Sequence, residues 1–141
     1  MALQSVSVSY LIVLGVSVVS FIFGWLWYTV LFGKIWSKEM GYGGKEMKKA
    51  KEKGMAKSMI LNFIGTFVMV YVIAMFVGLL SVNNFGDAAM LGFWIWLGFF
   101  AATTLLGDVL WEMRSWKLFF INGVYWLVNL IISAGILSVW K

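Results

Sequence analysis

Four ionisable side chains lie close together in an otherwise apolar stretch, GDVLWEMRSWKLFFIN, at residues 107–122. They are Asp108, Glu112, Arg114 and Lys117. Ionisable residues set in lipid commonly mark ion pathways and proton relays. Asp108 and Glu112 share a helix face at i and i+4, where like charges repel, so we expect a basic partner from Arg114, Lys117 or Lys57. The stretch is therefore either an ion-handling site or a turn where the chain leaves the membrane.

The position of the charges favours the turn. Asp108 precedes Trp111 by about 4.5 Å of helix at 1.5 Å per residue, and tryptophan is typical of the membrane–water interface. The other three charges follow, between two apolar segments. We interpret these four residues as an interfacial ion cluster that fixes the turn, and we expect no catalytic residue among them.

The composition indicates an integral membrane protein. The chain has 141 residues, of which 62% are hydrophobic and 12% charged, whereas soluble domains have roughly 45–50% and about 25%. It contains no Cys and no His, which removes thiolate nucleophiles, the commonest general base and the usual zinc ligands. We therefore predict a single transmembrane domain over residues 1–141, with no metal, no cofactor and no enzymatic activity.

Four apolar segments are long enough to cross a bilayer, which takes about 20 residues of helix. They span about 6–32, 58–80, 88–110 and 118–139. The fold class predicted is all-α: a polytopic membrane protein with four transmembrane helices in an up-down bundle of two hairpins.

The distribution of basic residues predicts the orientation. Eight lysines lie in the Lys-rich loop 33–57, and Arg114 and Lys117 lie in or beside the loop 111–117. Because Lys and Arg favour the cytoplasmic side, we expect both loops in the cytoplasm and both termini outside, in the plasma membrane. The Lys-rich loop suits anionic lipid headgroups, although it is equally well explained as a solvated topology anchor. It is too short for a nucleic-acid interface.

Amide and hydroxyl side chains inside the apolar segments form the candidate site. An unsatisfied polar group in lipid costs several kcal/mol, so these residues must face other helices or a wet cavity. The predicted ligand-binding set is Asn62, Thr66, Thr103, Asn122, Tyr125 and Asn129. The alternative is that they only hold the helices together.

The two halves of the chain carry a similar pattern. Gly15, Ser20 and Gly24 in the first segment match Gly98, Thr103 and Gly107 in the third. In addition, Lys57-x4-Asn62 opens the second segment and Lys117-x4-Asn122 opens the fourth. This pattern predicts a parallel 2+2 repeat, unless it is a coincidence of common residues. The small residues also predict close approach between helix backbones.

Three strings carry a family resemblance: GWLWYTVLFGKIW (24–36), WLGF (96–99) and RSWKLFFINGVYWLV (114–128). Together they resemble the DUF1761 family (domain of unknown function 1761). The resemblance implies a four-helix integral membrane protein and no particular activity. It also implies that six residues belong to one shared constellation: Trp27, Tyr28, Gly33, Trp36, Asn122 and Tyr125.

These observations leave three functional hypotheses. The first is a protein that binds membrane lipids or a small hydrophobic ligand through amides in an aromatic pocket, alone or as a transport component. The second is a structural or assembly protein that packs into a homo-oligomer or a larger membrane complex. The third and weakest is an intramembrane enzyme, for which only Asp108, Glu112 and tyrosines remain.

Overall fold

The computed structural model describes residues 7–40 and 55–140, and the described chain is helical with short turns. Its elements are α1 (Tyr10–Trp25), η2 (Leu26–Leu31), α2 (Gly33–Met40), α4 (Met55–Leu79), α5 (Phe85–Ile95), η3 (Trp96–Leu105), α6 (Leu106–Leu110) and α7 (Trp116–Val139). Within the described ranges, four continuous helices are long and apolar enough to cross a membrane: Tyr10–Leu31, Ala56–Leu79, Phe85–Leu110 and Trp116–Val139. The all-α prediction with four spanning segments is therefore confirmed.

Polar caps set where three of these helices begin. The side chain of Ser9 accepts a bond from Ile12 N, that of Asn84 from Asp87 N, and that of Ser115 from Leu118 N. Such caps satisfy backbone N–H groups that have no partner within the helix. The third and fourth segments consequently begin at Phe85 and Trp116, slightly earlier than hydropathy placed them.

The chain is helical in part of the predicted Lys-rich loop 33–57. Residues Gly33–Met40 form α2, and Met55–Lys57 already belong to α4. The remainder, 41–54, lies outside the described residues. Gly33 is required where α2 begins, because a Cβ there would lie 2.9 Å from the carbonyl oxygen of Tyr28.

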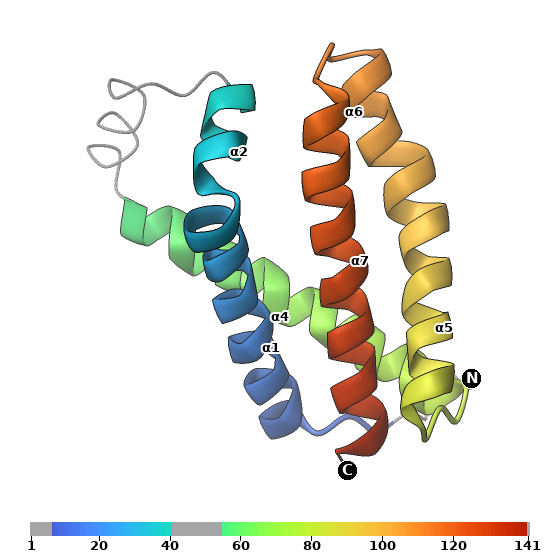
Figure 1. Ribbon diagram of the computed structural model, residues 1–141. Coiled ribbons are helices and arrows are strands. Elements are labelled where there is room, and N and C mark those ends of the chain that lie inside the picture. Colours follow the sequence, from blue (N-terminus) through green and yellow to red (C-terminus); the bar gives the residue numbers. More distant parts are fainter. Residues whose placement is uncertain (1–6, 41–54, 141) are drawn as a thin grey trace.

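Helix α7 is the centre of the molecule. Half of its most apolar window is buried, against about a fifth for each of the other spanning helices. Figure 1 shows α7 and α5 side by side and antiparallel, with α1 on the other side of α7. The backbones of α5 and α7 meet at Gly92, where a Cβ would lie 3.1 Å from Ile131 N.

Helix α4 is inclined across the other helices in Figure 1, and it packs mainly on α1 and α7. Its buried contacts with them include Val70 and Ile73, in the same core as Val13 and Leu130. Because of this inclination, the regular up-down arrangement of two hairpins is not confirmed.

Two segments of π-helix widen the spanning helices, η2 in the first and η3 in the third. In each, a threonine hydroxyl bonds the carbonyl four residues back: Thr29 to Trp25, and Thr103 to Phe99. This back-bonding commonly bends helices. The repeat pattern would align η3 with part of α1 rather than with η2, so the repeat is not confirmed either. Such π-bulges frequently mark functional sites, and residues of both segments, Tyr28 of η2 and Leu105 of η3, line one cavity.

Candidate functional site

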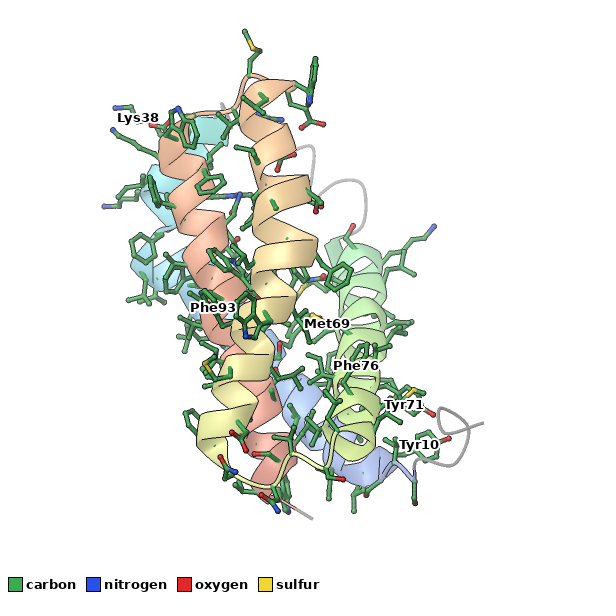
Figure 2. All side chains as sticks on the ribbon, turned by 90° about the vertical axis from the view of Figure 1, so that its right-hand side faces the viewer. Tyr10, Lys38, Met69, Tyr71, Phe76 and Phe93 are labelled. Carbon is green, nitrogen blue, oxygen red and sulfur yellow. The ribbon has the colours of Figure 1, made fainter. Side chains whose placement is uncertain are left out.

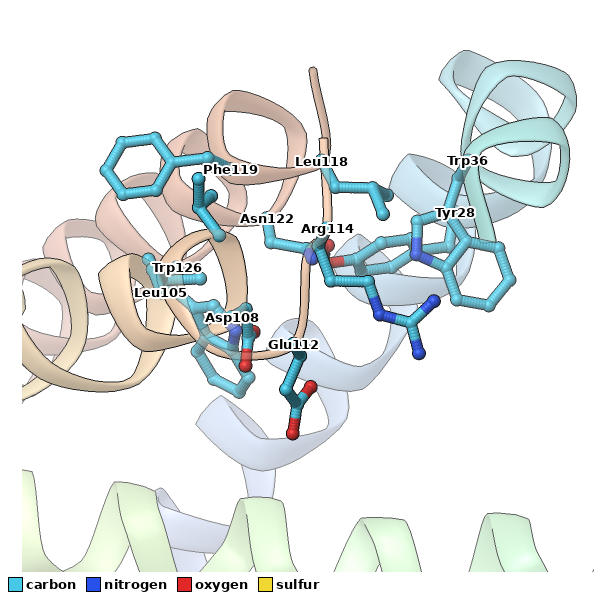
Figure 3. A pocket seen from close by; sticks show the side chains of 11 residues that line it. Tyr28, Trp36, Leu105, Asp108, Glu112, Arg114, Leu118, Phe119, Asn122 and Trp126 are labelled. Atoms are coloured by element: carbon cyan, nitrogen blue, oxygen red, sulfur yellow. Dashed lines mark hydrogen bonds between the residues drawn. The ribbon is translucent and has the colours of Figure 1, made fainter. Parts of the chain in front are cut away.

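A cavity of about 450 Å³ lies where η2 and α2 face the turn between α6 and α7 (Figure 3). It is lined by Tyr28, Trp36, Leu105, Asp108, Val109, Glu112, Arg114, Leu118, Phe119, Asn122 and Trp126. The cavity therefore brings together residues that the sequence presented as three separate groups. These are the polar stripe of the last helix, the aromatic constellation and the charged turn.

The polar side of the cavity contains a hydrogen bond that joins the first spanning helix to the last. Tyr28 Oη donates to Asn122 Oδ1 at 2.6 Å, and the neighbouring Trp27 Nε1 donates to the carbonyl oxygen of Ile121 at 3.1 Å. Two consecutive residues of η2 are thus hydrogen-bonded to two consecutive residues of α7. Asn122 uses its oxygen for this bond, and among the described residues its Nδ2 donates no hydrogen bond.

The aromatic wall is a set of rings in edge contact. Tyr28 meets Trp36 at a centroid distance of 5.4 Å and Tyr125 at 5.0 Å, and Tyr125 meets Trp126 at 5.0 Å. Edge contacts at these distances are favourable for rings. Tyr125 itself is buried behind the wall and lines no part of the cavity.

The six residues of the family constellation are neighbours in the structure. The rings of Trp27 and Tyr28 each contact the ring of Tyr125. Gly33 leaves room for the Tyr28 carbonyl oxygen, because it has no Cβ. Trp36 and Asn122 each contact Tyr28. Gly24, in the same string, belongs with them, because a Cβ there would lie 2.7 Å from Tyr125 Oη.

The charged residues of the turn are not joined in an ion-pair cluster. Asp108, Glu112 and Arg114 all line the cavity, yet among the described residues no salt bridge joins them to one another or to Lys57. Lys117 instead contacts Glu39 of α2 at 3.9 Å. The expectation that Arg114, Lys117 or Lys57 pairs with Asp108 is therefore wrong.

Backbone bonds hold the turn in place of ion pairs. Trp111 N donates to the carbonyl of Gly107, and Arg114 N donates to that of Asp108. Met113 takes a positive φ of 58° between them.

A second group of polar side chains forms a closed network deeper in the protein. Asn129, 1% exposed, accepts bonds from Ser20 Oγ at 2.7 Å and Ser133 Oγ at 3.4 Å, and its Nδ2 donates to Tyr125 Oη at 3.2 Å. The polar groups of Asn129 are therefore engaged by the protein, and this network joins α1 to α7. The interpretation of polar residues as interhelical bonds describes Asn129, through its bond with Ser20, whereas Tyr125 is bonded to Asn129 within α7.

The remaining predicted site residues lie elsewhere. Asn62 is exposed on α4, where its carbonyl accepts the hydroxyl of Thr66 at 2.9 Å, and the exposed Thr103 bonds within its own helix. Of the six predicted ligand-binding residues, the cavity contains Asn122 alone. The sequence prediction missed Trp126, one helical turn after Asn122, and missed that the charged turn faces the same cavity.

The described residues offer no metal centre, since no three His, Cys, Asp or Glu side chains gather among them. Four spanning-length helices, three of which line a cavity with aromatic and polar walls, define a small polytopic α-helical membrane protein. A family model described as "Protein of unknown function (DUF1761)" matches residues 11–138, and the chain belongs to this family. Comparisons with curated proteins and with solved structures found no match.

Proposed function

We propose that this chain is a non-enzymatic membrane protein that binds an amphiphilic molecule in the cavity beside Asn122. The observation that carries the proposal is the composition of the cavity wall. Aromatic rings adjoin an amide with free donors and three ionisable groups that make no ion pair among the described residues. Mostly apolar cavities with a few convergent polar groups are the usual form of a ligand site.

An apolar groove next to the cavity supports an amphiphile rather than a water-soluble ligand. This groove, of about 400 Å³, is lined by Met69, Val72, Ile73, Phe76, Ile95, Phe99, Phe100 and Leu130. Figure 2 shows Met69 and Phe76 between α4 and the helix formed by α5 and η3. Phe100 of the groove stacks on Trp126 of the cavity at 5.2 Å, so the two sites share a wall.

The charged end of the cavity supports a position at a membrane surface. Asp108, Glu112 and Arg114 follow or end the third spanning helix, where side chains reach water. We propose that this surface is cytoplasmic and that both termini lie outside, because the basic residues gather on this side. The plasma membrane is the proposed location.

Lipid retention by the purified chain tests the proposal. We expect Asn122→Leu to reduce the amount of lipid or hydrophobic ligand that stays bound in mild detergent, because it removes the amide and displaces Tyr28. Asn62→Leu, at an exposed site on α4, is the matched control. Equal retention by a folded Asn122→Leu protein would rule the proposal out.

A second candidate function is assembly into a homo-oligomer. It is favoured by a small-residue patch that the described chain does not use: Thr103 is exposed, and the Cβ position of Gly107 has no other atom within 4 Å. Small residues at such spacing let helices of two copies approach closely. The mass of the protein in mild detergent decides this point, and a strict monomer would exclude it.

A further inference from the structure

The cavity presents charges of both signs to a bound molecule. Figure 3 shows the Arg114 guanidinium directed toward Tyr28 and Trp36, Asp108 on the far side of the turn beside Trp126, and Glu112 between these two charges. No salt bridge connects these groups in the described chain. The positive charge of Arg114 and the negative charges of Asp108 and Glu112 are therefore both available to a ligand in the cavity.

The surroundings of each charge indicate what it would hold. Trp126 lines the same cavity beside Asp108 (Figure 3), and a carboxylate with an aromatic face is suited to an ammonium group. On the other side, the Arg114 guanidinium and the free Nδ2 of Asn122 are donors, which suit phosphate oxygens.

A ligand with one charge would fit this cavity poorly. An anion that reached Arg114 would also meet two carboxylates, and a cation on the carboxylates would leave the guanidinium unpaired. Glu112 is exposed, and Asp108 and Arg114 are half-buried, so the cost is mainly the close repulsion between like charges. A molecule that carries both charges satisfies both sides at once.

We propose that the cavity selects a zwitterionic group, an ammonium and a phosphate joined by a short link. The ammonium faces Asp108 and Glu112, and the phosphate faces Arg114 and Asn122. The group comes from a phospholipid headgroup or from the free headgroup compound. The adjoining apolar groove favours the lipid, whose acyl chain would pass the Phe100–Trp126 pair. This inference rests on the proposed ligand site.

Native mass spectrometry of the full chain in detergent tests the headgroup. Phosphatidylethanolamine and phosphatidylglycerol of identical acyl chains are compared as probes. We expect phosphatidylethanolamine to bind about tenfold more tightly, which corresponds to one additional charge-assisted bond. The double variant Asp108→Asn, Glu112→Gln should bring this ratio near one, and Arg114→Gln should weaken both lipids. Asp87→Asn, a carboxylate at the other end of the same spanning helix, is the matched control and should keep the ratio.

The outcomes separate this inference from the proposed function. If both lipids bind equally to the native chain and Asn122→Leu still abolishes binding, the ligand site stands and the zwitterion is wrong. A ratio that survives the double variant, with unchanged helix content by circular dichroism, also overturns the inference. If neither lipid binds at all, the proposed function fails as well. Free glycerophosphoethanolamine that competes as strongly as the lipid would confirm the zwitterion and assign its source to the soluble compound.

Discussion

The hydroxyl of Tyr28 donates a 2.6 Å hydrogen bond to Oδ1 of Asn122, and this bond joins the first spanning helix to the last at the wall of the cavity. The residues are 94 positions apart in sequence. The bond engages the amide oxygen and leaves Nδ2 without a hydrogen bond to any described residue. One pair thus links the packing of the helices to the chemistry of the candidate site.

Tyr28→Phe should remove this bond and keep the ring contacts. We expect the free energy of unfolding in detergent to fall by about 0.6 kcal/mol, the average for interhelical hydrogen bonds in a membrane protein. We expect ligand retention to fall as well, because the Asn122 amide is then free to rotate. Thr103→Val is the control, since that hydroxyl bonds within its own helix. An equal loss of ligand in both variants would contradict the positioning role of Tyr28.

Asn129→Leu should destabilise the protein far more than Asn62→Leu. The first change deprives the hydroxyls of Ser20 and Ser133 of an acceptor in the buried network, at a cost of about 1–3 kcal/mol. The second replaces an exposed side chain and should have almost no effect. Denaturant unfolding monitored by circular dichroism measures both, and equal effects would show that Asn62 is also packed against other helices.

Gly33→Ala should destabilise the protein by about 1–3 kcal/mol, the typical cost of overpacking. Its Cβ would lie 2.9 Å from the Tyr28 carbonyl, which is backbone and cannot rotate away. Gly65→Ala in α4 meets open space and should raise stability by about 0.5–1 kcal/mol, because alanine is the better helix former. Thermal unfolding of the two variants in one detergent gives the comparison, in which opposite signs are expected.

Lys117→Gln should change stability by at most about 1 kcal/mol, because the lysine side chain is exposed although that of Glu39 is 20% exposed. The Lys117 side chain is 75% exposed, and its Nζ lies 3.9 Å from Glu39, at the edge of contact. High salt should have as little effect on unfolding as the substitution does. A loss well above this range would mean that the pair anchors α2 to α7.

Single cysteines test the proposed orientation, because the native chain has no Cys that would react. Lys38→Cys in α2 should be protected from a membrane-impermeant thiol reagent in intact cells, and Asn83→Cys before α5 should be labelled. Both positions are exposed in the structure. After the membrane is opened, both should react. The reverse pattern in intact cells would invert the orientation.

The sequence alone determined the class of the protein and the approximate limits of its spanning helices. This was achievable because length and hydropathy are local properties, and only a helix of about 20 apolar residues satisfies its backbone inside lipid. The family constellation was also visible in sequence, as a set of aromatic and small residues around Tyr28 and Asn122. All four predicted helix starts differ from the structure by two to four residues, in three of them because a polar cap at Ser9, Asn84 or Ser115 sets the first residue.

The tertiary structure alone decided which polar residues meet. Asn62 and Asn122 follow a lysine at the same spacing, yet the first is exposed on α4 and the second lines the cavity. Sequence periodicity could not separate them, because spanning helices are apolar on nearly all sides and lipid does not distinguish one face from another. The choice was made by packing: α7 lies at the centre, between α1 and α5, and α4 is inclined across them. The same packing brought the charged turn to face the rings of Tyr28 and Trp36.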